Sequence, residues 1–549
     1  MKINRPAFSK AAHIGSLSLL VTLIACGGGG GDVGGTTRGA SASVTTQGNA
    51  PFYWHTTTSS VVVLKDANGV QVQPSAVTCA PQDPQQVQVN ADCSQITPLR
   101  LGTLNIQVSG NGATATLAVA SVTQRLWTGT HGASSSNGSG DFSFVTLADG
   151  SLLGWGANVS GALGLNKSAA DLAFQPTPTA VLSASGSGSL AGVAQGSAGL
   201  SNSLALTLEG LVWAWGNNAF KALGNASVIN QTLLPVPVLD LTARQPLQHV
   251  VQVETGGSRG VALIDDGTVV AWGQWPGNNT TNSSSLPTQV LAPDGATQLQ
   301  NIVAVSAGNT VSLALDNIGQ VYAWGFDVSD GSLGSGAVSG TASAKSNRVV
   351  KADGSPLTNI VQISAGYNFS LALASDGTVW SWGSNDSGQV GSERAQNTKV
   401  PFAVQIRTAS GSPTPLSGIS MVAAGGNHAL ALTTDGRVYA WGLATSGQLG
   451  DGAARPAGNA ALNPRLVVTQ TGSNAPIGAV SVAAGYKHSM VLLSDGSVLS
   501  WGDNFNSALG RVTAATSDPT PGPVLGLNGA GNLNLAPLSN YPNLLLRAR

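Results

Sequence analysis

From about residue 125 onward, apolar residues occur in short runs of five or six positions separated by glycine-rich turns. The stretch 419–450 shows this pattern clearly: one apolar run ends at Gly425, and two more flank Asp435-Gly436. An Asp-Gly dipeptide between apolar runs favours the two-residue turn of a β-hairpin. A second tight turn at 447–450 leads into a further extended segment. The pattern predicts a unit of four short antiparallel strands.

This unit occurs seven times. Each copy contains a Trp-Gly pair whose tryptophan stands five residues after a glycine, and the copies follow at intervals of 52 to 60 residues. Repeats of this period are typical of solenoids and propellers. One four-stranded unit cannot bury both of its faces, so its neighbours must stack on it, and closure into a ring removes exposed edges. We expect the tryptophans to form a repeated structural core: Trp155, Trp215, Trp272, Trp324, Trp382, Trp441 and Trp501.

The units resemble the repeat of the regulator-of-chromosome-condensation family. The seventh copy reads GYKHSMVLLSDGSVLSWGDNFNSALG and the fifth reads GYNFSLALASDGTVWSWGSNDSGQVG. The resemblance implies a seven-bladed β-propeller over residues 123–525. Only His428 and His488 keep the family's histidine, and the third copy, WGQWPGNNTTNSSSLP, is expected to lack the second glycine turn and to carry an insertion at 275–285.

Residues 50–122 have a different pattern of short β-type runs separated by Asn, Gly and Pro turns. They predict a small β-sandwich, and its last segment, GTLNIQVSGNGATATLAVAS, resembles the final hairpin of bacterial Ig-like domains. Cys79 and Cys93 are expected to form a disulfide in an exported protein. Residues 526–549 form a C-terminal tail, in which 543–547 could supply a strand that closes the ring.

The first 49 residues predict an export signal and a tether. Basic residues precede a short apolar run that ends in Leu23-Ile24-Ala25-Cys26, as in a secretory signal peptide over residues 1–25. The last four of these residues resemble a bacterial lipobox, which implies lipid attachment at Cys26. The Gly- and Ser-rich residues 26–49 are expected to be a flexible tether. By resemblance to lipoproteins with Gly after the cysteine, we expect a lipid anchor in the outer membrane, facing the periplasm or the cell surface.

Composition agrees with an all-β exported protein. Charged residues make up only 9% of the chain, glycine contributes 71 residues, and the formal net charge is −1. Long amphipathic helices need more charged residues on their wet face. Nucleic-acid binding needs clustered Lys and Arg, and the sequence has no basic run. We therefore expect no nucleic-acid partner, and membrane contact through the N-terminal lipid only.

The sequence offers little catalytic or metal-binding chemistry. His428 and His488 occupy equivalent positions, and we expect each to hydrogen-bond the backbone of its own unit rather than to form a metal site or an acid/base pair. The aspartates before the turn glycines fit turn chemistry, and 326–332 and 384–393 lack the ligand spacing of an EF-hand. No phosphate-binding loop or nucleophile elbow is present. We expect no catalytic residues, no metal ligands and no cofactor.

Aromatic residues outside the repeat are candidates for binding. Trp127, Trp275 and Tyr367 are predicted at loops or strand ends. Exposed aromatics on loops are common anchors of a binding face, and the alternative is that these three only cap the ends of the four-stranded units. The segment around Trp275, with Asn278 and Asn279, is the first candidate binding loop.

Three classes of function follow from these features. We favour a non-catalytic module that binds an unknown protein or an envelope or cell-surface component. An envelope hydrolase or lyase would require convergent, buried ionisable groups at the channel mouth, and a spacer for adhesion is also open. The family resemblance implies GTPase exchange activity in some members, but an exported protein would not meet that partner.

Overall fold

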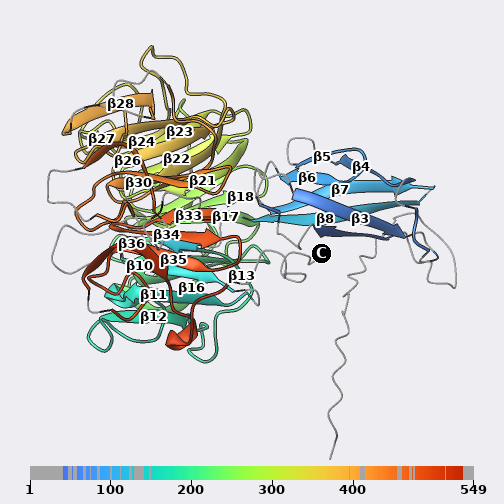
Figure 1. Ribbon diagram of the computed structural model, residues 1–549, viewed down its shortest axis with the longest axis horizontal. Coiled ribbons are helices and arrows are strands. Elements are labelled where there is room, and N and C mark those ends of the chain that lie inside the picture. Colours follow the sequence, from blue (N-terminus) through green and yellow to red (C-terminus); the bar gives the residue numbers. More distant parts are fainter. Residues whose placement is uncertain are drawn as a thin grey trace, which may run out of the picture.

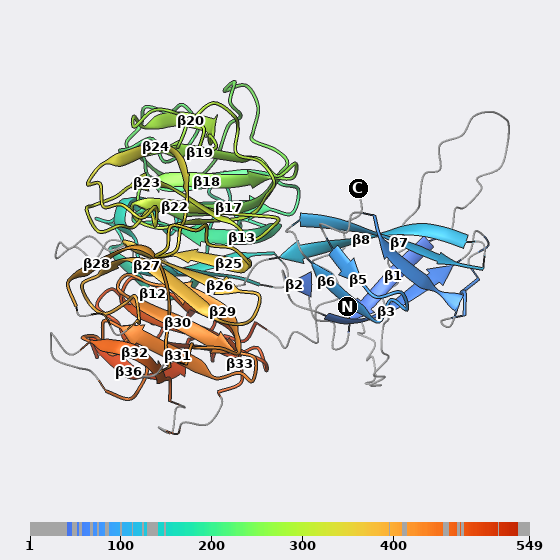
Figure 2. The same ribbon diagram turned by 90° about the horizontal axis from the view of Figure 1, so that it is seen from above.

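The computed structural model describes residues 41–535, apart from short gaps at 47–51, 54–57, 66–67, 69, 74–75, 83–86, 99–101, 112, 123–125, 129–140, 148–149, 393, 395, 409–413, 454–459, 469–472, 474–476 and 514. These residues are organised almost entirely as strands in four-stranded sheets. Two sheets form a small N-terminal region, and seven form the larger body beside it (Figures 1 and 2). The all-β prediction is confirmed. Cys26 and the predicted signal peptide lie outside the described residues.

The N-terminal region is a sandwich of two sheets. One has the order β1 (Ser41–Thr46), β3 (Thr58–Lys65), β6 (Gln95–Pro98) and β5 (Val87–Val89), and the other β2 (Phe52–Tyr53), β8 (Ala113–Val122), β7 (Gly102–Gly110) and β4 (Thr78–Pro81). Leu64 and Ile96 of one sheet share a core with Ile106 and Leu117 of the other. Because β1 pairs with β3, this region begins inside the predicted tether 26–49, and the predicted boundary at residue 50 is wrong.

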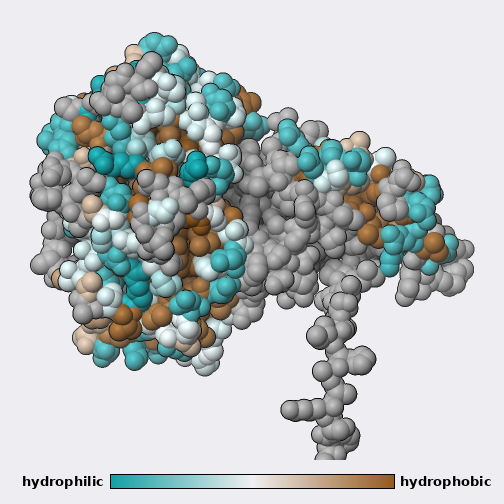
Figure 3. Space-filling view, viewed as in Figure 1, coloured by the Kyte–Doolittle hydropathy of each residue, from teal (hydrophilic) through white to brown (hydrophobic). Residues whose placement is uncertain are grey.

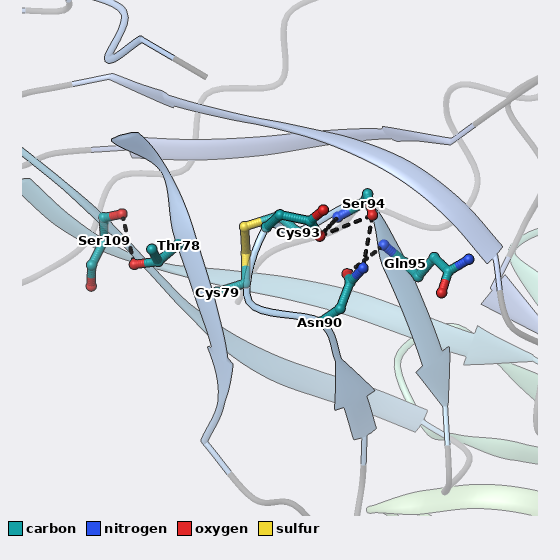
Figure 4. The surroundings of a disulfide bond; sticks show 8 residues. Thr78, Cys79, Asn90, Cys93, Ser94, Gln95 and Ser109 are labelled. Carbon is teal, nitrogen blue, oxygen red and sulfur yellow. Dashed lines mark hydrogen bonds between the residues drawn. A yellow bond between two sulfur atoms is a disulfide. The ribbon is translucent and has the colours of Figure 1, made fainter. Parts of the chain in front are cut away.

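A disulfide between Cys79 and Cys93 links β4 to the turn before β6, with the two Cα atoms 5.2 Å apart (Figure 4). Asn90 holds the same turn, because its side chain donates to Ser94 Oγ and accepts from the Gln95 amide. Closing a loop of 14 residues stabilises a fold by about 3 kcal/mol. The predicted pairing is present.

The larger body consists of seven meandering sheets, numbered 1 to 7 in chain order, and each has four consecutive strands. The first strands are β9 (Leu126–Thr128), β13 (Val193–Ala198), β17 (Val250–Gly256), β21 (Ile302–Ala307), β25 (Ile360–Ala365), β29 (Ile419–Ala424) and β33 (Ala479–Ala484). The second strands are β10 (Phe142–Thr146), β14 (Asn202–Thr207), β18 (Arg259–Ile264), β22 (Val311–Asp316), β26 (Phe369–Ala374), β30 (His428–Thr433) and β34 (His488–Leu493). The third strands are β11 (Leu152–Ala157), β15 (Val212–Asn217), β19 (Val269–Gly273), β23 (Val321–Phe326), β27 (Val379–Asn385), β31 (Val438–Gly442) and β35 (Val498–Asp503). The fourth strands are β12 (Phe174–Ala180), β16 (Gln231–Pro237), β20 (Ser284–Gln289), β24 (Ala342–Arg348), β28 (Thr398–Gln405), β32 (Ala461–Leu466) and β36 (Ser517–Pro523).

The first strands contact one another in succession, and β9 contacts both β13 and β33, so sheets 1 and 7 are neighbours. Side chains on the first strands join adjacent sheets. The amides of Gln195, Gln252 and Gln362 each accept from and donate to the backbone of one residue on the next first strand. Each side-chain amide thus makes the two hydrogen bonds that a backbone N–H and C=O would make, at a place where the two sheets have no strand pairing between them. They join sheet 2 to sheet 3, sheet 3 to sheet 4, and sheet 5 to sheet 6.

All seven repeat tryptophans are fully buried, as predicted. Six of them donate from the indole nitrogen to a backbone carbonyl of the preceding sheet, at 2.7 to 3.1 Å: Trp215 to Ala162, Trp272 to Ala222, Trp382 to Ser332, Trp441 to Gln389, Trp501 to Gln448 and Trp155 to Ala508. The last of these bonds joins sheet 1 to sheet 7. The tryptophans therefore lie between sheets, and their indole hydrogen bonds join every adjacent pair of sheets except sheets 3 and 4, where Trp324 has no acceptor.

A turn glycine in each sheet makes room for the tryptophan of the next. A Cβ on Gly391 would lie 2.6 Å from Trp441 Nε1, and a Cβ on Gly510 would lie 2.7 Å from Trp155 Nε1. In the loop of sheet 3, Gly277 occupies the equivalent position against Trp324 of sheet 4. The predicted loss of this turn is therefore wrong. The loop after Trp272 is shortened, not lengthened by an insertion, because Gly277 follows its sheet's tryptophan sooner than the equivalent glycines do.

The chain after β36 covers the junction of sheets 7 and 1. Val524, Leu533 and Leu535 are buried in one cluster with Leu126 and Trp155. The short 3-10 helix η4 (Leu527–Gly529) lies within this segment. The possible closing strand at 543–547 lies outside the described residues. The first strand of sheet 1 is β9.

No helix in the described part of the chain is long and apolar enough to cross a membrane. On the side shown in Figure 3, apolar and polar side chains are interspersed over the larger body.

Candidate functional site

The loops of the seven sheets lie at two opposite ends of the stack. The loops between first and second strands lie at the same end as the loops between third and fourth strands. In each sheet a backbone hydrogen bond joins the two loops; in sheet 7, for example, the Asp503 amide donates to the Lys487 carbonyl. We call this end the loop face, and the end with the second-to-third-strand turns the hairpin face. Backbone bonds also connect loops of adjacent sheets, for example from the Tyr367 amide to the Gly425 carbonyl. The loop face is therefore a rigid surface.

Exposed apolar side chains are concentrated on the loop face. Of thirteen exposed large hydrophobic residues in the described part of the chain, seven belong to connections between third and fourth strands: Phe220, Val228, Ile229, Val328, Val338, Phe505 and Val512. An eighth, Phe174, begins the fourth strand β12 of sheet 1. The hairpin face has fewer, such as Ile318. Apolar side chains on well-anchored loops favour binding of a partner.

His428 and His488 connect sheets. His428 Nε2 lies 2.9 Å from Ser489 Oγ of sheet 7, and His488 Nε2 lies 2.9 Å from Ser143 Oγ of sheet 1. The expectation that each would bond the backbone of its own unit is wrong, because each imidazole reaches the following sheet. Burial lowers the pKa of His428 to about 3 and that of His488 to about 4, so both are neutral at pH 7. Their role is structural.

Ionisable groups gather on the loop face where sheets 7 and 1 meet. Asp141 precedes β10 and Asp503 ends β35, while Tyr486 and Lys487 lie in the loop before β34. Burial, with a contribution from Asp503, raises the pKa of Asp141 to about 7. Burial also raises the pKa of Asp503. One Asp141 carboxylate oxygen is buried without a hydrogen-bond partner. We call Asp141, Asp503, Tyr486 and Tyr367 the seam cluster.

Two tyrosines meet across this part of the loop face. The ring centroids of Tyr367 in sheet 5 and Tyr486 in sheet 7 are 5.7 Å apart and tilted by 56°. The intervening sheet has Gly426, where a Cβ would lie 2.6 Å from Tyr486 Cδ2. Glycine at this position lets the tyrosines meet over sheet 6. Burial, then the nearby Tyr367 and Asp141, raises the pKa of Tyr486.

The predicted binding loop of sheet 3 is partly used inside the protein. Trp275 stacks on Phe326 at 5.1 Å and lies over the buried Arg259 guanidinium at 5.2 Å. Asn279 donates to the Gly295 carbonyl at 2.8 Å. Asn278 lines a shallow groove of about 460 Å³ along β20. The three predicted residues therefore do not converge on one site.

Trp127, another candidate aromatic, is buried within β9 and cannot anchor a partner. Tyr367, which the sequence placed at a loop, does contribute to the loop face.

Among the seven first strands, Glu254 is the only ionisable residue that the structure describes. It accepts from Gln195, Ser197 and Gln252. Burial raises the pKa of Glu254 to about 7. Because its oxygens are occupied by neutral donors, this carboxyl contributes to the contact between sheets 2 and 3.

The acidic turns have structural roles. Asp266 and Asp376 each accept from the threonine two residues later, which is ordinary turn capping. In the segment 326–332, the Asp327 carboxylate accepts backbone amides of its own loop, including those of Asp330 and Gly331. Among the described residues, no group of three His, Cys, Asp or Glu side chains is arranged to hold a metal ion.

Sequence reasoning did not identify the residues of the seam cluster, although buried ionisable groups at the channel mouth were the feature expected of an enzyme. Asp141 lies before the first repeat strand and Asp503 ends the last Trp-containing strand. A departure from the repeat supplied one signal: Tyr367 and Tyr486 occupy equivalent positions, where the intervening copy has Gly426.

The sequence is similar to known repeat proteins. Residues 274–537 match the profile described as RCC1-like domain, and residues 209–263 and 193–221 match profiles of the regulator of chromosome condensation (RCC1) repeat. The human E3 ubiquitin-protein ligase HERC2 is 28% identical over 380 residues, which cover 68% of this chain and 7% of the ligase. The mitochondrial RCC1 domain-containing protein RUG3 of Arabidopsis thaliana is 28% identical over 327 residues, which cover 58% of this chain and 66% of that protein. The chain thus spans less than two thirds of each.

Among solved structures, yeast RCC1 (Prp20) bound to Kap60 is similar, with a TM-score of 0.53 and 25% identity over 67% of this chain and 82% of that one.

Proposed function

Because the chain belongs to the RCC1-repeat β-propeller family, we propose that it is a non-catalytic module that binds another protein through its loop face. The observation that carries this proposal is the concentration of exposed apolar residues on that face. Partner recognition by loops on a rigid scaffold needs no cofactor or metal.

The relatives support binding rather than one shared activity. A ubiquitin ligase and a mitochondrial protein both match, and each is longer than the matched region. The element that they share with this chain is the repeat region. Yeast RCC1 is bound to another protein, Kap60, in the matching structure. A propeller used as a binding surface is consistent with all three.

We further propose that the seven sheets are blades of one seven-bladed propeller, because the Trp155 and His488 contacts join the first sheet to the last. The N-terminal sandwich is proposed to be Ig-like. From the sequence of residues 1–49, the chain is proposed to be exported and anchored to the outer membrane by lipid on Cys26. The partner is then a protein or an envelope or cell-surface component.

One observation favours a second candidate, an envelope hydrolase or lyase. Asp141 and Asp503 are two neighbouring carboxyls with raised pKa values at the channel mouth, and such pairs can serve as acid and base. Binding ranks first because the apolar residues extend over several loops beyond this pair.

Photo-crosslinking tests which face binds. A benzophenone amino acid is placed in the full chain at Phe505 on the loop face or at Ile318 on the hairpin face, which are 64% and 66% exposed. Each variant is irradiated with an envelope extract, and adducts are identified by mass spectrometry. We expect a protein adduct from position 505 and none from 318. Equal labelling at both positions, or labelling at 318 alone, contradicts the proposal.

A further inference from the structure

We propose that the seam cluster binds a cationic side chain, a lysine or arginine, of the protein partner. The partly exposed Asp503 would contact the charged group, the buried Asp141 would add its negative charge, and Tyr367 and Tyr486 would flank the site. This inference rests on the proposed function and adds the chemistry that the partner must present. The cluster adjoins the exposed apolar residues of the surrounding loops, because the Phe505 amide donates to Asp503 Oδ2 at 3.2 Å.

The first support is a carboxylate oxygen without a partner. Asp141 is 5% exposed, and its Oδ1 accepts no hydrogen bond. Burying an ionisable group costs free energy unless it is paired. A cation held at the neighbouring Asp503 would offset part of this cost through its electrostatic attraction to Asp141.

The second support is the charge at the seam. Two carboxyls, Asp141 and Asp503, interact electrostatically with one ammonium group, that of Lys487. With both carboxyls ionised, the local charge is −1. His488, which lies behind them against Ser143, is neutral at pH 7 and contributes no positive charge. The site is therefore suited to one additional positive charge.

The aromatic rings add specificity for an organic cation. An ammonium or guanidinium group within about 6 Å of a tyrosine ring is attracted by its π face. Lys487 already illustrates this contact, because its Nζ lies 5.6 Å from the centroid of Tyr486. Lys487 is only partly buried, so its flexible side chain can move aside. We infer that Lys487 is an internal competitor for the site.

This competition gives the proposal a signature that a structural role would not produce. Removing an acid by Asp503→Asn should weaken binding of a cation, while removing the competitor by Lys487→Gln should strengthen it. Loss of folding would weaken binding in both variants. The control is Asp495→Asn, which changes an equivalent charge in a turn of the hairpin face, where Asp495 only caps Ser497.

The experiment measures fluorescence anisotropy with the full chain and labelled peptides of sequence Gly-Gly-X-Gly-Gly, where X is Arg, Lys or Gln. For the Arg or Lys peptide we expect about tenfold weaker binding with Asp503→Asn and about threefold tighter binding with Lys487→Gln. Asp495→Asn should bind like the unaltered chain, and the Gln peptide should not bind. Free ethylguanidinium should compete only at far higher concentration, because it lacks the peptide contacts.

Several results would overturn the inference. These are equal binding of the Gln peptide, a shift of both variants in the same direction, or competition by ethylguanidinium as strong as that of the peptide itself, which would indicate a small-amine site. If the peptides fail to bind while crosslinks persist at Phe505, the cation site is wrong and the binding face stands. If both fail, the proposed function is wrong as well.

Discussion

The seven buried tryptophans offer a direct test of what holds adjacent sheets together. Trp441 donates to the Gln389 carbonyl at 2.9 Å, whereas the indole nitrogen of Trp324 is buried without an acceptor. The difference coincides with the shortened loop of sheet 3, in which Gly277 packs on Trp324 but no carbonyl accepts from its indole nitrogen. Replacing each tryptophan by phenylalanine removes the same ring volume from two fully buried sites.

The two substitutions should therefore differ by the hydrogen bond alone. Trp441→Phe leaves the Gln389 carbonyl buried without its donor, which costs about 1–3 kcal/mol. Trp324→Phe removes a buried N–H group that has no acceptor, and so removes the free-energy cost of burying that group without a hydrogen bond. We expect Trp441→Phe to lower the free energy of unfolding by about 1–3 kcal/mol more than Trp324→Phe does.

The assay is guanidinium-induced unfolding of the full chain, followed by circular dichroism, for the two variants and the unaltered protein. Equal slopes with different midpoints would report a change in stability. Equal loss in both variants would show that these indoles stabilise the stack by packing alone. A larger loss with Trp324→Phe would refute the assignment of donors.

Two further predictions concern glycine packing and pH. Gly391→Ala should destabilise the chain more than Gly354→Ala, because both have positive φ but only a Cβ at 391 would meet a tryptophan of the next sheet; thermal unfolding of the two variants measures the difference. Because the folded-state pKa of Asp141 is raised from 3.8 to about 7, its ionisation should lower stability as the pH rises from about 4 to 7. Between pH 5 and 8, Asp141→Asn should remove up to roughly 3 kcal/mol of this loss in the free energy of unfolding, which unfolding experiments at the two pH values measure. An unchanged dependence of stability on pH would contradict the burial of the Asp141 carboxyl.

The repeat allowed much of the fold to be predicted, because a fixed spacing carries the same physical requirement into every copy. Each repeat tryptophan is buried and all seven four-stranded units are present, since hairpin turns and apolar runs are local signals. The shortened loop of sheet 3 was misjudged because the glycine turn was sought at a constant distance from Trp272. Gly277 meets the same steric requirement from a nearer position.

The candidate site was less accessible to sequence reasoning because closure creates it. Asp141 and Asp503 are separated by nearly the whole repeat region and become neighbours only where sheet 7 meets sheet 1. The partners of the histidines were misassigned for the same reason, since His488 bonds Ser143 across that junction. Contacts between the ends of a repeat array depend on how many copies complete the circle, which no single copy encodes.

Closure of the sheets into a ring is the claim on which the loop face and the seam cluster both depend. A double-mutant cycle between His488→Ala and Ser143→Ala tests it, because these residues are 345 positions apart and their side chains meet at 2.9 Å only if the ring closes. The account predicts a coupling energy of about 0.5–1.5 kcal/mol in unfolding experiments, similar to that of the equivalent pair His428 and Ser489 inside the stack. Additive effects at the junction, with coupling retained inside the stack, would contradict closure.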